Sequence, residues 1–215
     1  MNDINYQKIF REIADELQNI DDLGKVATYI PELRDVDPSK LGAHLTTVDS
    51  DHFYFGDSDE KFSIQSIAKV LSLTLALKMI GEKVWERVGV EPSGSAFNSL
   101  VQLEYEKGFP RNPLINAGAI VVCDILVDCL ANPKIDLLEF IRSITGNSSI
   151  NYNDTMAESE KRTGYRNYSL VNLMKDFGNI HNDIDSVLDF YFNLCSIEMT
   201  CKDLAQTFLF LATGG

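Results

Sequence analysis

The chain has 215 residues, of which 45% are hydrophobic and 24% are charged, and its formal net charge is -13. This composition is that of an ordinary folded protein, which argues against intrinsic disorder and against a coiled coil. An acidic surface repels phosphate backbones and anionic lipid headgroups, so we expect neither nucleic acid nor a membrane as a partner.

The opening MNDINYQKIFREIADELQNI has no basic segment followed by an apolar one, and no apolar run reaches the ~18 residues that suggest a membrane span. We therefore expect a cytoplasmic protein. The four cysteines lack CxxC spacing, which favours reduced thiols over metal or redox roles. His44, His52 and His181 are scattered without ligand spacing. The sequence thus predicts no metal and no cofactor.

The first 65 residues combine one helix with short strands. Apolar residues at helical spacing predict a helix from Tyr6 to about Ile20. A loop, GKVATYIPEL, follows and is interrupted by Pro31. The segments AHLTTV and HFYFG, joined by DSD, predict a hairpin, and KFSIQS predicts a third strand of the same sheet. We expect the first helix to cover one face of that sheet.

From Ser66 onward the pattern is mainly helical. SIAKVLSLTLALKMI is apolar nearly all round and stops at Gly81, which predicts a buried helix. A Pro-rich turn feeds a second apolar helix, NAGAIVVCDILVDCL. Further helices are expected over 135–145, 168–176, 183–195 and 200–214, the last with a capping-box-like TCKD start. The prediction is an α+β fold, with 1–65 supplying the first helix and strands and 66–215 a mainly helical subdomain.

The segment Ser66-Ile67-Ala68-Lys69 carries the first candidate chemistry. Positions three apart share a helix face, so the Lys69 amine can reach the Ser66 hydroxyl. A Ser–Lys pair performs acyl transfer only if the lysine is neutral, and burial must therefore lower its pKa from the usual ~10.4. Free N–H groups at the start of the helix would face a developing oxyanion.

SxxK alone is a weak signal, because Ser58-Asp59-Glu60-Lys61 has the same spacing in an acidic turn. Only Ser66 follows a strand and opens an apolar helix. The simpler interpretation makes Ser66 a helix N-cap and Lys69 a lysine whose stem is buried and whose head is solvated.

Three other places hold polar residues that hydrophobic patterning does not explain. Asn116, in NPLINAGAI, can cap a helix or present its amide to a ligand. Glu160 and Asn167 lie in ESEKRTGYRN, which we interpret as a polar loop between helices. Tyr191 lies in the apolar run DFYFNLCSIEMT and is by default a core tyrosine.

Taken together, these segments resemble the glutaminases, which hydrolyse L-glutamine to L-glutamate and ammonia on a fold similar to serine β-lactamases and transpeptidases. The matching segments occur in family order over 24–215: KVATYIPEL, FSIQSIAK, GVEPSGSAFNS, NPLINAGAI, SEKRTGYRN and DFYFNLCSIEMT. The resemblance implies an antiparallel sheet with flanking helices and a helical subdomain.

The resemblance also implies roles for particular positions. Ser66 would be the nucleophile and Lys69 its proton acceptor, with Tyr191 assisting proton movement. The residues implied to line the glutamine pocket are Tyr29, Gln65, Ser66, Asn116, Glu160, Asn167 and Tyr191. Glu160 suits the α-ammonium group, whereas Tyr29, Asn116 and Asn167 suit the α-carboxylate.

The sequence departs from the family pattern at its end, because family members continue with further strands that complete the oxyanion hole. From the resemblance we expect those C-terminal strands to be missing here, and we expect a homodimer or homotetramer. Two other interpretations stay open: a β-lactamase-like acyl hydrolase, and a non-catalytic amino-acid-binding or scaffolding fragment.

Overall fold

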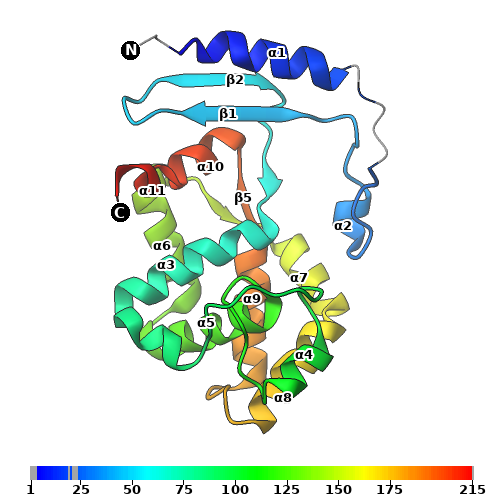
Figure 1. Ribbon diagram of the computed structural model, residues 1–215, viewed down its shortest axis with the longest axis vertical. Coiled ribbons are helices and arrows are strands. Elements are labelled where there is room, and N and C mark those ends of the chain that lie inside the picture. Colours follow the sequence, from blue (N-terminus) through cyan, green and yellow to red (C-terminus); the bar gives the residue numbers. More distant parts are fainter. Residues whose placement is uncertain (1–3, 19, 21–23, 215) are drawn as a thin grey trace.

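The computed structural model describes residues 4–18, 20 and 24–214. It is mainly helical, with two small antiparallel sheets (Figure 1). The helices are α1 (Tyr6–Gln18), α2 (Pro31–Arg34), α3 (Ala68–Ile80), α4 (Leu100–Tyr105), α5 (Asn116–Cys129), α6 (Pro133–Thr145), α7 (Asp154–Thr163), α8 (Tyr165–Asp176), α9 (Ile184–Cys195), α10 (Cys201–Thr207) and α11 (Leu209–Thr213). The strands are β1 (Gly42–Thr46), β2 (His52–Gly56), β3 (Phe62–Ser63), β4 (Asn151–Tyr152) and β5 (Ile197–Met199). Two 3-10 turns, η1 (Gln65–Ile67) and η2 (Gly81–Glu86), flank α3.

The predicted hairpin is confirmed, and so is its helical cover. β1 and β2 pair antiparallel, with Gly42 opposite Gly56 and Thr46 opposite His52. α1 lies along this hairpin at one end of the molecule (Figure 1), where its Phe10 packs edge-on to Phe55 at 5.6 Å between ring centroids. β1 also contacts α10, so helices lie against both strands of this small sheet. Residue 19 of the predicted first helix lies outside the described residues.

The prediction of a third strand in the hairpin sheet was wrong. β3 has only two residues, and it pairs with β5, with Ser63 opposite Glu198. β4 pairs with the other edge of β5, so these three strands form a separate sheet. The strand ends early because Gln65 takes a left-handed backbone conformation, with φ of 47°, and begins η1. Local alternation could not reveal a partner that lies more than 130 residues later in the chain.

The two predicted apolar helices form the centre of the core. Every residue of α5 from Ala117 to Leu126 is buried, and α5 contacts both α3 and α9. α3 has six buried residues among its 13 and ends at Gly81, whose φ of 60° fits the left-handed region that favours glycine. The expectation of a buried helix opened by the SxxK segment is confirmed.

The remaining helix predictions were partly right. α6, α8 and α9 lie where helices were expected, each within three residues of the expected start. The last predicted helix is divided at Phe208 into α10 and α11, and its capping box is present, because Thr200 and Asp203 exchange side-chain-to-backbone bonds of 3.1 Å. The polar loop predicted around ESEKRTGYRN was wrong, since α7 ends at Thr163 and α8 begins at Tyr165.

α7 was missed because it has little apolar periodicity. Its signals are a helix-capping Asn153, whose side chain accepts from the Met156 amide at 2.9 Å, followed by strong helix formers. Among the described residues, no helix is long and apolar enough to cross a membrane. The division of the chain at residue 65 stays a prediction; β3, before it, and β5, after it, belong to one sheet.

Candidate active site

One cavity gathers nearly all of the residues that the sequence singled out. It has a volume of about 330 Å³. Seven of the eight predicted site residues line it, namely Tyr29, Gln65, Ser66, Asn116, Glu160, Asn167 and Tyr191. These residues come from segments that are far apart in the sequence. α7 and α8 pack against α9, and α9 in turn packs against α3, α5 and η1, which brings the segments together. The eighth, Lys69, is buried next to this cavity, where it bonds to Asn116.

Ser66 lies in η1, directly before α3, and its side chain is exposed to the cavity. Neither its hydroxyl nor its backbone N–H has a hydrogen-bond partner in the part of the chain that the structure describes. The preceding Gln65 has a φ of 47°, an uncommon conformation for a residue with a side chain. Such strain often marks a functional turn, where it directs a nucleophile into a site.

Lys69 is 2% exposed, which makes it the one fully buried lysine among the described residues. Burial lowers the pKa of its ammonium group, although nearby Glu160 acts in the opposite direction. Its Nζ donates to the backbone oxygen of Leu114 at 3.1 Å and to Oδ1 of Asn116 at 2.8 Å. A neutral amine has two N–H groups and one lone pair. In the neutral form, these two acceptors engage both N–H groups and leave the lone pair without a hydrogen bond to either of them.

The two acceptors of Lys69 lie where a tight turn enters α5, with Leu114 in the turn and Asn116 at the first position of the helix. Asn112 Oδ1 accepts from the amides of Leu114 and Ile115 at 3.0 and 3.1 Å, which closes a tight turn. Gly118 permits this turn to pack on the helix, since a Cβ there would lie 1.9 Å from the backbone oxygen of Asn112. The NPLINAG sequence therefore forms a turn that directs the Leu114 carbonyl and the Asn116 amide oxygen toward Lys69.

Asn116 does not cap α5, although capping was the commoner of its two expected roles. Ile115 occupies the N-cap, and Asn116 is the first helical residue. Its Oδ1 accepts from Lys69 while its Nδ2 donates to Oδ1 of Asn167 at 3.1 Å. Asn167 therefore retains its own NH₂ group, which it can donate to a ligand in the cavity. This chain of amides connects the lysine to the far side of the site.

Glu160 projects from α7 into the cavity and is 8% exposed. Burial, with a further contribution from the nearby Glu32, raises the pKa of its carboxyl group to about 7. Burial disfavours the ionised form of this carboxyl group, but a cation bound beside it would stabilise the ionised form. The cavity thus contains a strongly perturbed acid that lacks a permanent ion pair among the described residues.

Tyr191 and Cys195 lie one turn apart on α9, and both line the cavity. Tyr191 is 2% exposed, which matches the default core position, yet it also faces the site. Burial raises the pKa of the Cys195 thiol to about 12, so this cysteine stays protonated and is a poor nucleophile. Tyr29, 63% exposed, precedes α2 and forms the outer wall.

Sequence reasoning missed five residues that line the cavity: Asn98, Thr163, Gly164, Arg166 and Cys195. Four of them lie within four residues of a predicted site residue, so proximity in the sequence was an available signal. Asn98 is different, because it lies in the loop before α4, and only the pairing of Asn116 N with Phe97 O at 2.9 Å shows that this loop reaches the site.

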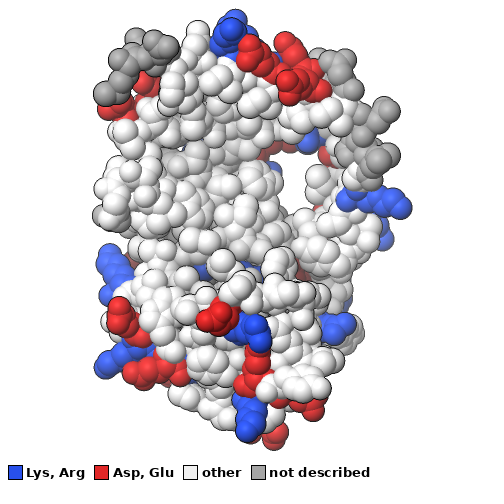
Figure 2. Space-filling view, viewed as in Figure 1, with Lys and Arg blue, Asp and Glu red and all other residues white. Residues whose placement is uncertain are grey.

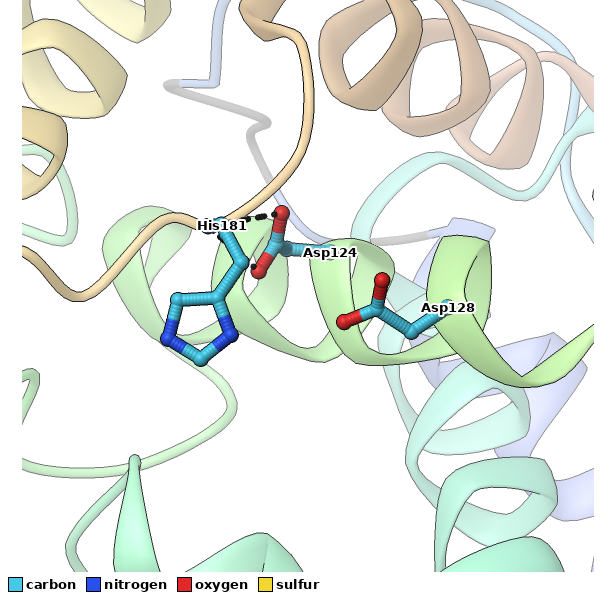
Figure 3. A group of neighbouring side chains, drawn as sticks. All are labelled: Asp124, Asp128 and His181. Atoms are coloured by element: carbon cyan, nitrogen blue, oxygen red, sulfur yellow. Dashed lines mark hydrogen bonds between the residues drawn. The ribbon is translucent and has the colours of Figure 1, made fainter.

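A second polar cluster lies away from the cavity and has a structural role. Asp124 and Asp128 lie one turn apart on α5, and His181 approaches Asp124 from the loop before α9 (Figure 3). The Asp124 carboxylate already accepts from Arg87 and from the amides of His181 and Asn182. Burial opposes ionisation of Asp124, but these donors outweigh it and lower its pKa. The carboxylate is occupied, so we assign the cluster to stability rather than to metal binding.

The two remaining histidines are close together in space, contrary to the expectation that they are scattered. Across the β1–β2 hairpin, His44 Nε2 lies 3.1 Å from His52 Nδ1. The surface charges show no comparable gathering: Figure 2 shows acidic and basic side chains interspersed around a largely uncharged middle on the face drawn.

Comparison with known proteins decides the family. The sequence model described as Glutaminase matches residues 24–215. The chain belongs to the glutaminase family. A glutaminase of Saccharophagus degradans is 69% identical over 215 residues, which cover 100% of this chain and 70% of the relative. A glutaminase of Christiangramia forsetii is 55% identical, covering 99% of this chain and 70% of the relative.

Solved structures agree with this assignment. The chain superposes on the structure titled "Probable glutaminase ybaS" with a TM-score of 0.92 at 28% identity, covering 100% of this chain and 70% of that one. It superposes on Mglu "in its tris and glutamate form" with a TM-score of 0.88 at 32% identity, covering 97% of this chain and 47% of that one. The fold is therefore the mixed α+β, β-lactamase-like fold of these glutaminases.

Proposed function

We propose that this glutaminase-family chain hydrolyses L-glutamine to L-glutamate and ammonia through an acyl-enzyme on Ser66. The observation that carries the proposal is a cavity of about 330 Å³ that is lined by the exposed Ser66 and the buried Glu160. The buried amine of Lys69 lies behind this lining, where it bonds to Asn116. The solved relative Mglu is described in a form with glutamate, which is the product expected of this reaction.

Recognition of the amino-acid end of the substrate follows from the charges available. The Glu160 carboxylate pairs with the α-ammonium group, which compensates for the burial that otherwise disfavours the ionised acid. The free NH₂ group of Asn167 and the hydroxyl of Tyr29 donate to the α-carboxylate. This arrangement leaves the side-chain amide of glutamine directed toward Ser66.

The first chemical step transfers a proton and forms an ester. Neutral Lys69 takes the proton of the Ser66 hydroxyl as Oγ attacks the amide carbon, and the backbone N–H of Ser66 donates to the oxyanion that forms. The C–N bond then breaks, and the proton that Lys69 holds passes to the departing nitrogen, which leaves as ammonia. Tyr191, buried beside the site, would assist this transfer.

The second step reverses the roles of the groups. Lys69, again neutral, takes a proton from water as the water oxygen attacks the ester carbon. The ester bond breaks, the proton returns to Oγ of Ser66, and glutamate leaves. Burial lowers the pKa of Lys69, which favours the neutral amine that both steps require.

Ammonia release from L-glutamine by the full-length protein tests the proposal, with Ser66→Ala as the inactive variant. The matched control is Ser58→Ala, which alters the other SxxK sequence but lies outside the cavity. Ser58 is buried, rather than exposed as its acidic turn suggested. We expect Ser66→Ala to lose at least about 10³-fold in kcat and Ser58→Ala to retain activity. Equal ammonia release by Ser66→Ala and the parent would exclude Ser66 as the nucleophile.

Mass spectrometry of the acyl-enzyme separates the proposal from its alternatives. A glutamyl adduct on Ser66 supports glutamine hydrolysis, whereas an adduct from a β-lactam but not from glutamine would favour the β-lactamase-like alternative. Binding of glutamine without any ammonia release would favour an amino-acid-binding role. A cytoplasmic location and a homodimeric or homotetrameric assembly stay predictions, which cell fractionation and light scattering test.

A further inference from the structure

A single hydroxyl connects the nucleophile turn to the helix that carries Tyr191. Ser63 Oγ donates to the backbone oxygen of Cys195, the last residue of α9, at 2.8 Å. Ser63 Oγ also accepts from Nε2 of Gln65 at 3.0 Å. Ser63 is thus bonded to a residue 132 positions later in the chain and to Gln65, the residue immediately before Ser66.

The chemistry of the three groups fixes the direction of both bonds. A serine hydroxyl has one proton, and the Cys195 carbonyl can only accept, so that proton must point to Cys195. The Gln65 side chain can then bond to Ser63 only through its NH₂ group. Its orientation in the cavity wall is therefore determined by Ser63, and its oxygen is directed away from the hydroxyl.

The bond to Cys195 also satisfies a group at the end of a helix. The last carbonyls of a helix lack partners within it, and the Cys195 carbonyl has no other hydrogen-bond donor in the described part of the chain. β3 and β5 fix the backbone on either side, since the Ile64 amide donates to the Ile197 carbonyl at 2.9 Å. Ser63 thus lies where a strand, a helix end and the nucleophile turn meet.

The backbone conformation of Gln65 explains why its contact with Ser63 matters. With φ at 47°, Gln65 adopts a conformation that side chains disfavour, so contacts around it must hold it there. Among the described residues, the Gln65 side chain hydrogen-bonds only to Ser63. A turn that relaxed would move Ser66 relative to Lys69, which lies on the next turn.

We propose that Ser63 is a positioning residue, whose hydroxyl holds Gln65 in its left-handed conformation and so keeps Ser66 oriented for attack. The inference rests on the proposed function for its catalytic consequence, but its structural content stands apart from it. Ser63 touches neither the substrate nor the reacting atoms, and it acts through Gln65.

Steady-state kinetics of full-length Ser63→Ala and Ser63→Thr provide the first test. We expect Ser63→Ala to lower kcat roughly tenfold, the size of one or two lost hydrogen bonds, while KM changes about twofold or less. Ser63→Thr keeps the hydroxyl on a strand residue and should restore most of kcat. The control is Ser143→Ala, which removes a hydroxyl-to-carbonyl bond of 2.7 Å at an exposed position of α6.

A double-mutant cycle shows whether the effect passes through Gln65. In a Gln65→Ala background the partner of Ser63 is absent, so Ser63→Ala should lower kcat further by no more than about twofold. An equal loss in both backgrounds, or no rescue by threonine, would overturn the positioning role and indicate general structural damage. Full activity of Ser63→Ala would overturn it outright.

A crystal structure of Ser63→Ala tests the inference without any activity. We expect the Gln65 side chain to leave its present position and the 65–67 turn to shift. If the turn and the φ of Gln65 are unchanged, the proposal is wrong, whether or not the protein hydrolyses glutamine. If the parent releases no ammonia but the turn shifts in the variant, the proposed function fails and the structural role of Ser63 stands.

Discussion

Replacing Glu160 with glutamine should make the protein more stable and less active at once. Glu160 is 8% exposed, and burial, with a further contribution from Glu32, raises the pKa of its carboxyl group from 4.5 to about 7. The folded state therefore holds the proton more tightly than the unfolded state. The contribution of Glu160 to the free energy of unfolding is highest below about pH 4.5, where the carboxyl group is protonated in both states. This contribution falls as the pH rises toward 7.

The difference between the two pKa values, 4.5 and about 7, means that ionisation of Glu160 lowers the unfolding free energy by about 3 kcal/mol at pH 8. At pH 5 it lowers the unfolding free energy by less than about 1 kcal/mol. Glutamine has nearly the same shape and no charge to bury. We expect the Glu160→Gln variant to exceed the parent in stability by up to about 3 kcal/mol at pH 8, with a much smaller excess at pH 5. Urea unfolding at both pH values measures this difference.

Activity should change in the opposite direction. A hydrogen bond to a charged group contributes about 1.5–3 kcal/mol, so loss of the carboxylate should lower kcat/KM about 10- to 150-fold, mostly through KM. In the parent, kcat/KM should fall as the pH drops below about 7, because protonated Glu160 cannot pair with the α-ammonium group. This acid limb should be weaker in the variant.

The control for both measurements is Glu158→Gln, an exposed position on the same helix. It removes the same charge from α7 without altering the cavity. If the stability difference between Glu160→Gln and the parent is the same at pH 5 and pH 8, the raised pKa is wrong. If kcat/KM is unchanged, Glu160 does not bind the ammonium group.

Three further predictions concern other groups. Asn116→Asp places a carboxylate 2.8 Å from Lys69 Nζ, so it should raise the pKa of the lysine, lower kcat near pH 7, and recover activity at higher pH; a pH–rate profile measures this. Asp124→Ala leaves the partly buried guanidinium of Arg87 without its carboxylate partner and should lower the unfolding free energy by about 3–5 kcal/mol, as measured in urea. The Cys195 thiol, with its pKa raised to about 12, should react only slowly with iodoacetamide at pH 8, as followed by mass spectrometry.

Each of these has a matched comparison. Asn172→Asp adds the same charge at an exposed position of α8 and should leave the pH–rate profile in place. Asp128→Ala, one turn after Asp124 on α5 and exposed, should cost little stability, and equal stability of the two aspartate variants would contradict the assigned ion pair. Cys201 is half-buried and should be alkylated sooner than Cys195; the reverse order would show that the cavity thiol is ionised.

The sequence by itself determined what depends on neighbouring residues. The all-round apolar pattern after Ser66 and the stop at Gly81 predicted α3 correctly, because burial and the glycine turn are encoded locally. The capping box at Thr200 was predicted for the same reason. The ordered family segments also indicated which seven polar residues would share a pocket, and all seven line one cavity.

Only the tertiary structure decided how the polar groups are connected. Whether Asn116 caps its helix or receives a bond from Lys69 depends on how α3 and α5 pack, and both outcomes fit the same local sequence. The pairing of β3 with β5, and the Ser63 bond to Cys195, join segments separated by more than 130 residues. Side-chain periodicity reports which face of an element is buried, but it does not identify the partner. The lysine's desolvation and the turn at Gln65 are consequences of that packing, so they became visible only in the folded chain.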